Sequence, residues 1–160
     1  MQKPHNVGLR KAIEITLTPT QRDRARRLLL HEAGGDESAD VLGAAAERVC
    51  QRLSHHAGKV LGADTFKALI TRALALVKPD YPFLGPVTVE LPEACLKGLR
   101  ESLQTQTASL AADAVVAVLA TFLALLAGFI GEELSLSVLV EVWAERSLAD
   151  VSLISREAEI

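Results

Sequence analysis

The longest uncharged stretch of this chain, residues 114–131 (AVVAVLATFLALLAGFIG), constrains the fold more than any other feature. Thr121 is its only polar side chain, and its large apolar residues would point to most sides of a helix. A helix that is apolar all round has to be buried, either at the centre of a domain or in a bilayer. Small residues also recur along it at helical spacing, which would let another backbone approach closely: Ala117, Ala120, Ala124, Ala127, Gly128 and Gly131.

The flanks of this stretch favour the centre of a folded domain over a bilayer. A membrane-spanning helix needs about 20 apolar residues, with Lys or Arg on its cytoplasmic side and Trp or Tyr at the interfaces. Here Asp113 precedes the stretch, and Glu132 and Glu133 follow it. No Lys or Arg occurs between Arg100 and Arg146. We therefore expect a buried central helix and no membrane partner.

The charge of the chain is divided unevenly between its two parts. Of the 160 residues, 49% are hydrophobic and 4% aromatic, which is typical of one Ala-, Leu- and Val-rich helical domain. Residues 1–100 hold 15 of the 17 basic side chains and 11 of the 20 acidic ones. A nucleic-acid surface needs one concentrated basic field. The uneven division instead favours complementarity between the two parts or between subunits, and it argues against nucleic acid as a partner.

The two cysteines, Cys50 and Cys95, both fall in segments with a helical pattern. They are too few for a disulfide scaffold and lack the spacing of metal ligands. We expect buried free thiols in a reducing cytoplasm, with no metal and no cofactor. Residues 1–12 contain no apolar core of the signal-peptide type, which agrees with a cytoplasmic location.

The hydrophobic periodicity predicts a single mainly α domain over residues 1–160, a bundle of five or six helices around a central apolar helix at 110–130. The other helices are expected at 19–33, 41–61, 65–78, 92–104 and 134–143, the last of which also alternates as a strand would. Residues 13–17 and 87–91 alternate too and predict a short two-stranded β-ribbon. Each opens a strand-then-helix unit, and the two units resemble each other. The tails at 1–11 and 148–160 are expected to be loosely ordered.

His55 and His56 belong to the most reactive-looking sequence of the chain, His-His-Ala-Gly-Lys. A histidine on an exposed helix face with Lys three residues later resembles the phosphoacceptor motif of histidine phosphotransfer proteins. In that family Gly follows the Lys, whereas Val60 follows Lys59 here. Helical phase places His56 beside the apolar stripe and His55 towards solvent. The resemblance implies a phosphoacceptor role for one of them, and the alternative is a solvated helix surface.

The sequence VTVELPEACLKGL, residues 87–99, resembles the strand and first helix of ribbon-helix-helix DNA-binding proteins. Those proteins read bases with strand side chains, and the outward ones here would be Thr88 and Glu90. A carboxylate in that position would be repelled by the phosphate charge of DNA. Four arginines could contact phosphate, although they also fit a solvated helix face: Arg22, Arg24, Arg26 and Arg27.

The segments LITRALALVKPDYPFL and FLALLAGFIGEELSLSVLVEVW together resemble a class of uncharacterised all-helical bacterial proteins, over roughly residues 40–147. This resemblance implies a fold and no activity. The chain offers no Gly-rich phosphate loop after a strand and no nucleophile beside a histidine at recognisable spacing, so we expect no enzyme.

The function that we expect is that of a non-catalytic interaction or regulatory domain of a bacterial cytoplasm, self-associating as a homodimer. The alternatives are a DNA-binding regulator of the ribbon-helix-helix type and a histidine phosphotransfer protein. A dense apolar face follows Gly131 and either forms the interaction surface or closes the bundle. Its members are Leu136, Leu139, Val140 and Trp143.

Overall fold

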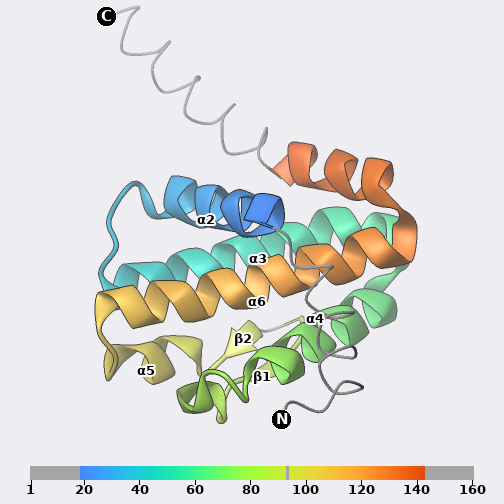
Figure 1. Cartoon of the computed structure of the whole chain (residues 1–160). Coiled ribbons are helices and arrows are strands. Elements are labelled where there is room, and N and C mark those ends of the chain that lie inside the picture. Colours follow the sequence, from blue (N-terminus) through green and yellow to red (C-terminus); the bar gives the residue numbers. More distant parts are fainter. Residues whose placement is uncertain (1–18, 93, 143–160) are drawn as a thin grey trace, which may run out of the picture.

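The computed structural model describes residues 19–92 and 94–142, and helices make up most of this part of the chain (Figure 1). In chain order its elements are α2 (Pro19–Ala33), α3 (Ala39–Leu61), α4 (Ala63–Val77), the 3-10 helix η1 (Pro82–Leu84), β1 (Thr88–Glu90), β2 (Ala94–Lys97), α5 (Leu99–Gln104) and α6 (Ala108–Ile130). Residues 132–142 form a further helix. The prediction of a mainly helical bundle with a short β-ribbon is confirmed. The tails predicted at 1–11 and 148–160 lie outside the described residues.

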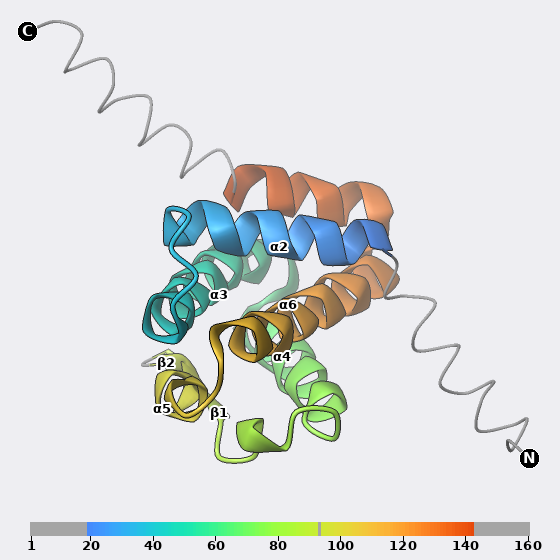
Figure 2. The same ribbon diagram turned by 60° about the vertical axis from the view of Figure 1, so that its left-hand side comes forward.

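Two long helices, α3 and α6, run side by side in the same direction through the middle of the fold (Figures 1 and 2). On one side of them lie α2 and the helix at residues 132–142, and on the other lie α4, α5 and the β1–β2 hairpin. The docking of α2 on α3 includes an ionic contact. Glu32 is only 6% exposed, and its carboxylate forms ion pairs with Arg48 Nε at 2.7 Å and with Arg52 at 2.9 Å.

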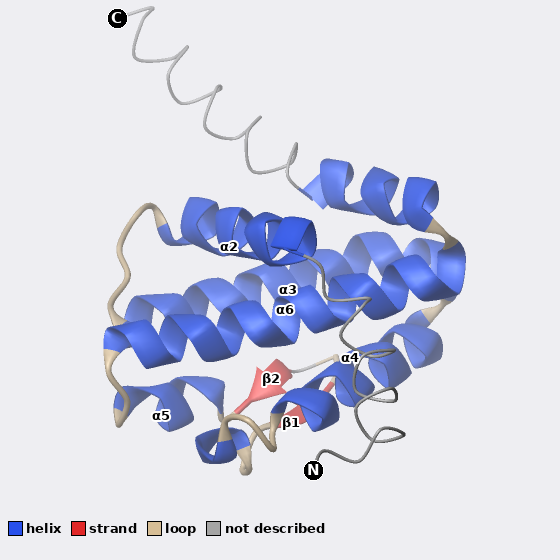
Figure 3. Ribbon diagram, in the orientation of Figure 1, coloured by secondary structure: helices blue, strands red, loops and turns tan. Residues whose placement is uncertain are grey.

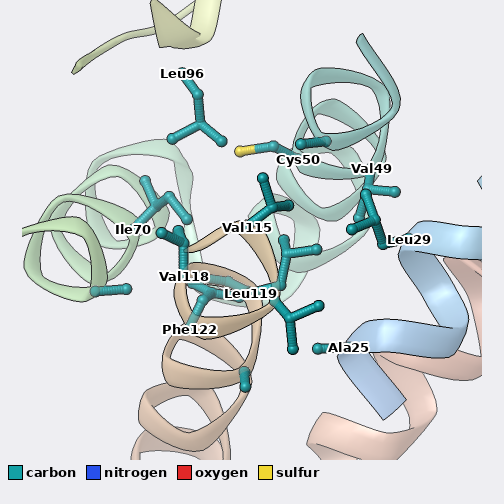
Figure 4. Packing of buried hydrophobic residues seen from close by; sticks show 14 of the residues in the cluster. Ala25, Leu29, Val49, Cys50, Ile70, Leu96, Val115, Val118, Leu119 and Phe122 are labelled. Atoms are coloured by element: carbon teal, nitrogen blue, oxygen red, sulfur yellow. The ribbon is translucent and has the colours of Figure 1, made fainter. Parts of the chain in front are cut away.

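The α6 helix is the buried central helix that the uncharged stretch predicts. It begins after Thr107, whose hydroxyl accepts the Leu110 N–H, and it ends at Gly131. By length and composition alone it could cross a membrane, and 78% of its most apolar part is buried inside the fold. Phe122 lies in the core with its ring 5.2 Å from that of Phe66 on α4, edge to face. Figure 4 shows Phe122, Leu119 and their neighbours filling the space between the helices.

Only the first half of the small-residue stripe of α6 is buried against other elements. Ala120 and Ala124 are buried, but Gly128 is exposed, and a Cβ built there would meet no atom within 4 Å. The close approach occurs at Gly43 on α3 instead, where a Cβ would lie 2.8 Å from Cγ and 3.2 Å from Cα of Arg100 on α5. The expectation of a backbone crossing along the whole stripe is therefore wrong at its Gly128 end.

The helix predicted at 92–104 is wrong in its first half, where β2 pairs antiparallel with β1 (Figure 3). Gly98 follows β2 with φ +87°, a left-handed conformation that interrupts a helix and that glycine adopts without strain. Only the six residues of α5 after it are helical. Both strands of the ribbon thus belong to one hairpin. The partner strand predicted at 13–17 lies outside the described residues.

Cys50 on α3 and Cys95 on β2 form a disulfide, with their Cα atoms 6.0 Å apart. The expectation of free thiols is therefore wrong, because β2 lies against α3 at a distance that a disulfide bridges. Figure 4 shows the Cys50 sulfur between α3 and Leu96 of the hairpin. Disulfides persist mainly in oxidising compartments. The predicted cytoplasmic location rested partly on free thiols, and the cysteines therefore no longer support it.

The two central helices, α3 and α6, have the same length and end in the same way. Both α3 and α6 have 23 residues, and both are followed by a glycine of the same conformation, with φ 92° and ψ 152° at Gly62 and φ 93° and ψ 157° at Gly131. A second helix starts directly after each glycine. The fold therefore contains two helical hairpins whose turns have the same backbone conformation.

Candidate interaction surface

Three of the exposed large apolar side chains lie where α3 and α6 end, at the right-hand side of Figure 1. We call this region the corner end, because the chain turns there at Gly62 and again at Gly131. Val60 is 46% exposed, Phe129 61% and Leu134 43%. The remaining members of the corner end are charged side chains next to these in sequence or in the first turns of α4: Lys59, Asp64, Lys67 and Glu133.

Some charged side chains of the helices are paired within the fold and others are not. Lys59, Lys67, Asp64 and Glu133 form no ion pair within the part of the chain that the structure describes. On the flanks, by contrast, opposite charges meet across the fold. Examples are Arg24 with Glu132 at 3.2 Å, Arg26 with Asp113 at 3.5 Å and Arg100 with Asp40 at 2.9 Å. The corner end thus combines three exposed apolar side chains with four charged ones that have no ion pair to any described residue, as is also true of Arg22, Arg72 and Glu101 elsewhere on the helices.

The apolar face predicted after Gly131 is divided between core and surface. The helix at 132–142 buries Ser135, Val138 and Val142, and Leu139 packs against the same core. Leu136 is half-buried, and Val140 is 62% exposed. Trp143 lies outside the described residues. Within the described helix, closing the bundle accounts for most of the apolar face, and Val140 is its one largely exposed member.

Sequence reasoning missed Val60 and Phe129 as surface residues. Val60 fits the inward stripe of α3, and Phe129 belongs to a helix that is apolar all round, so the pattern predicts both as buried. In the structure both lie on the uncovered side of the last turn of their helices, while the next residues, Leu61 and Ile130, pack against the core. The glycines on either side of Phe129, at 128 and 131, were the available signal, since they mark the end of the buried helix.

His55 and His56 lie on α3 as their helical phase predicts. The His56 side chain is 10% exposed, and its Nδ1 lies 3.1 Å from the Glu141 carboxylate. His55 is exposed and borders a surface depression of about 650 Å³ that Lys67 and Pro92 also line. The two imidazole rings stand edge to face with their centres 5.1 Å apart. The structure thus leaves His55, and not His56, open to a reaction partner.

The arginine cluster of α2 is largely matched by acids. Arg24 and Arg26 pair with the acidic second part of the chain, as given above, and Arg27 pairs with Asp23 at 3.0 Å. Complementarity between the two parts of the chain is therefore confirmed. Arg22 lines a depression of about 470 Å³ beside Tyr81, whose pKa is raised above its usual value by burial and by the nearby Asp113 carboxylate.

The unit that resembles a ribbon-helix-helix protein is a β-hairpin in the structure, so its strand is not followed directly by a helix. Among the described residues, no group of three or more His, Cys, Asp or Glu side chains is placed to hold a metal ion. No protein-family model, curated protein or solved structure matches this chain.

Proposed function

We propose that this chain is a non-catalytic helical interaction domain that binds protein through its corner end. A monomeric protein usually buries its large apolar side chains or scatters them singly over the surface. Here three of the five large hydrophobic side chains that are exposed in the described region gather at one end of the bundle: Val60, Phe129 and Leu134, with Leu110 and Val140 elsewhere. Such a cluster, rimmed by charges, is typical of a protein-binding surface.

The exposure of Phe129 is the observation that carries this proposal. Its ring is 61% exposed in the last turn of the most buried helix of the fold. Full burial of an aromatic side chain contributes roughly 1.5–3 kcal/mol, and aromatic residues are enriched in interfaces. A Cβ built at the neighbouring Gly128 would meet no atom within 4 Å, so the helix surface next to Phe129 is open as well.

Site-specific photo-crosslinking in the source cell tests this proposal directly. Phe129 is replaced by the photoreactive analogue benzoylphenylalanine, and Leu110, an exposed apolar residue at the other end of α6, is replaced in a matched control. We expect one discrete protein adduct from position 129 and none from position 110. Equal labelling from both positions, or no adduct from position 129, would contradict protein binding at the corner end.

A second candidate function, histidine phosphotransfer, is favoured by the exposure of His55 beside Lys67. Phosphoramidate can test it, because this donor transfers its phosphoryl group to an imidazole nitrogen and releases ammonia. Phosphotransfer requires a phosphate on the purified chain that is labile in acid and disappears in a His55→Gln variant. Equal phosphate on the wild type and His55→Gln, or none on either, would count against His55 as the acceptor.

A further inference from the structure

We infer that the disulfide between Cys50 and Cys95 is a redox-sensitive clamp, which holds the β1–β2 hairpin on α3 and releases it when the bond is reduced. This inference goes beyond the proposed function and does not involve the corner end. Three features carry it: the way the hairpin is attached, the length of chain that the bond closes, and the packing of the helices away from the hairpin.

The hairpin is attached to α3 by few groups besides the disulfide. The Glu47 carboxylate accepts the N–H groups of Cys95 and Leu96 at 2.7 and 2.9 Å. Cys95 and Leu96 are also the buried side chains of β2, whereas both Thr88 and Glu90 of β1 are exposed. The covalent bond therefore lies at the point where the hairpin is held, next to its main polar contact.

The bond closes a long segment of chain. Cys50 and Cys95 are 45 residues apart in sequence, and α4, η1 and β1 lie between them. A cross-link that closes a segment of this length lowers the conformational entropy of the open chain. When the bond is broken, docking of the hairpin has to overcome that entropy again. The hairpin should therefore dock more weakly in the reduced chain.

The helices pack on one another without the hairpin. Leu29 on α2 and Leu119 on α6 are fully buried on the side of α3 that faces away from Leu96 (Figure 4). On α4, Phe66 packs against Phe122 of α6 with the two rings 5.2 Å apart. Because these contacts involve no residue of the hairpin, reduction should release the hairpin while the helical bundle stays folded.

The reductant that fits this reaction is a dithiol. One of its thiolates attacks a sulfur of the bond, forms a mixed disulfide with that cysteine and displaces the other cysteine as a thiolate, which takes up a proton. Its second thiol then closes the disulfide of the reductant and releases the first cysteine as a thiol. Two electrons and two protons thus pass from the dithiol to Cys50 and Cys95. Both residues are 0% exposed, so the hairpin has to open before the attack, and such local opening is easier than global unfolding.

Release of the hairpin would also change the depression beside His55. Leu91 and Pro92, in the turn of the hairpin, line this depression together with Gln51 and His55 of α3. Gln51 also donates to the carboxylate of Glu47, which holds β2. The oxidised chain thus keeps the hairpin side of the depression in place, and the reduced chain should lose it.

The rate at which dithiothreitol reduces the purified, folded chain tests local opening. Alkylation and mass measurement at successive times count the free thiols. We expect Glu47→Ala to raise the rate by about tenfold, since it removes the acceptor of two N–H groups that hold the hairpin. Leu29→Ala, which destabilises the bundle on the far side of α3, is the matched control and should leave the rate unchanged. Equal acceleration in both variants, or two free thiols before any reductant is added, would overturn the inference.

Hydrogen exchange followed by NMR tests the release itself. In the reduced chain we expect protection of the Cys95 and Leu96 amides to fall by about tenfold or more, with no change at Leu119 and Phe122. Reoxidation with glutathione disulfide should restore it. A Cys50→Ala and Cys95→Ala double variant should show the low protection with or without reductant. Full protection of the hairpin in the reduced chain, or loss of protection in α6 as well, would overturn the clamp.

Discussion

The Glu47 carboxylate on α3 accepts the backbone N–H of Cys95 on β2 at 2.7 Å, through Oε2. Its other oxygen, Oε1, accepts the next backbone N–H, that of Leu96, at 2.9 Å. Gln51, one turn further along α3, donates to Oε2 at 3.1 Å and steadies the carboxylate. One side chain of α3 thus supplies the acceptors for two consecutive N–H groups of β2.

Loss of this carboxylate should destabilise the fold. Glu47→Ala leaves two partly buried N–H groups without an acceptor, and an unsatisfied buried donor costs about 1–3 kcal/mol. We expect the free energy of unfolding, measured by urea titration, to fall by an amount in this range. Glu37→Ala, at an exposed loop position, is the matched control and should change little. Equal stability of the two variants would show that water satisfies the N–H groups of β2.

The contact between Gly43 and Arg100 predicts a cost for adding one methyl group. In Gly43→Ala the new Cβ would lie 2.8 Å from Arg100 Cγ and 3.2 Å from its Cα, so α5 must shift. Overpacking of this kind costs typically about 1–3 kcal/mol. The measurement is thermal unfolding followed by circular dichroism.

Gly128→Ala provides the opposite case on the central helix. The new Cβ would meet open space, and Ala is favoured over Gly within a helix by about 0.8–1.0 kcal/mol. The two variants should therefore shift the melting temperature in opposite directions. Stabilisation by both would indicate that Arg100 has room to move away from Gly43.

Truncation of the buried aromatic ring should be far more costly than truncation of the exposed one. Phe122 is fully buried and contacts Phe66, whereas Phe129 on the same helix is 61% exposed. Phe122→Ala should cost about 3–5 kcal/mol, and Phe129→Ala should stay within about 0.5 kcal/mol in the monomer. Urea unfolding at low protein concentration measures both. Similar losses in the two variants would place Phe129 in the core.

The ion pair between Arg100 and Asp40 predicts a dependence on pH. The hydrogen bond and the positive charge of Arg100 hold the pKa of Asp40 below its ordinary value. Because the carboxyl pKa is lower in the folded state, the pair contributes stability above the unfolded-state pKa and loses it as the pH falls through the folded-state pKa. Carboxyl NMR titration should show the Asp40 pKa rising in Arg100→Gln. An unchanged Asp40 pKa in that variant would contradict the contact.

Most of the helices could be predicted because their cause is local. Helices α2, α3, α4 and α6 follow from apolar spacing and from the residues that end them, such as Gly62 and Gly131. The hairpin could not be predicted, since two N–H groups of β2 bond to Glu47, which lies 48 residues before Cys95. Nothing in the sequence near Cys95 indicates that distant contact.

Only part of the corner end could be predicted from the sequence. Hydrophobic periodicity predicts which side of a helix is apolar, but not where its neighbours stop covering it. Val60 and Phe129 are exposed in the last turns of α3 and α6, although the residues that follow them, Leu61 and Ile130, still pack against the core. Which side chains of an apolar helix its neighbours leave uncovered depends on how the bundle is assembled, and this is a property of the tertiary structure.

Gly62 and Gly131 have the same backbone conformation, and each turns the chain without help from the side chains beside it. At both corners the direction of the chain is set by the backbone, through a positive φ and an N–H that bonds to the carbonyl four residues earlier. The exposed side chains beside them are therefore not needed to shape the turn. Substitutions at Val60, Phe129 or Leu134 can therefore change the surface proposed to bind protein while the bundle keeps its fold.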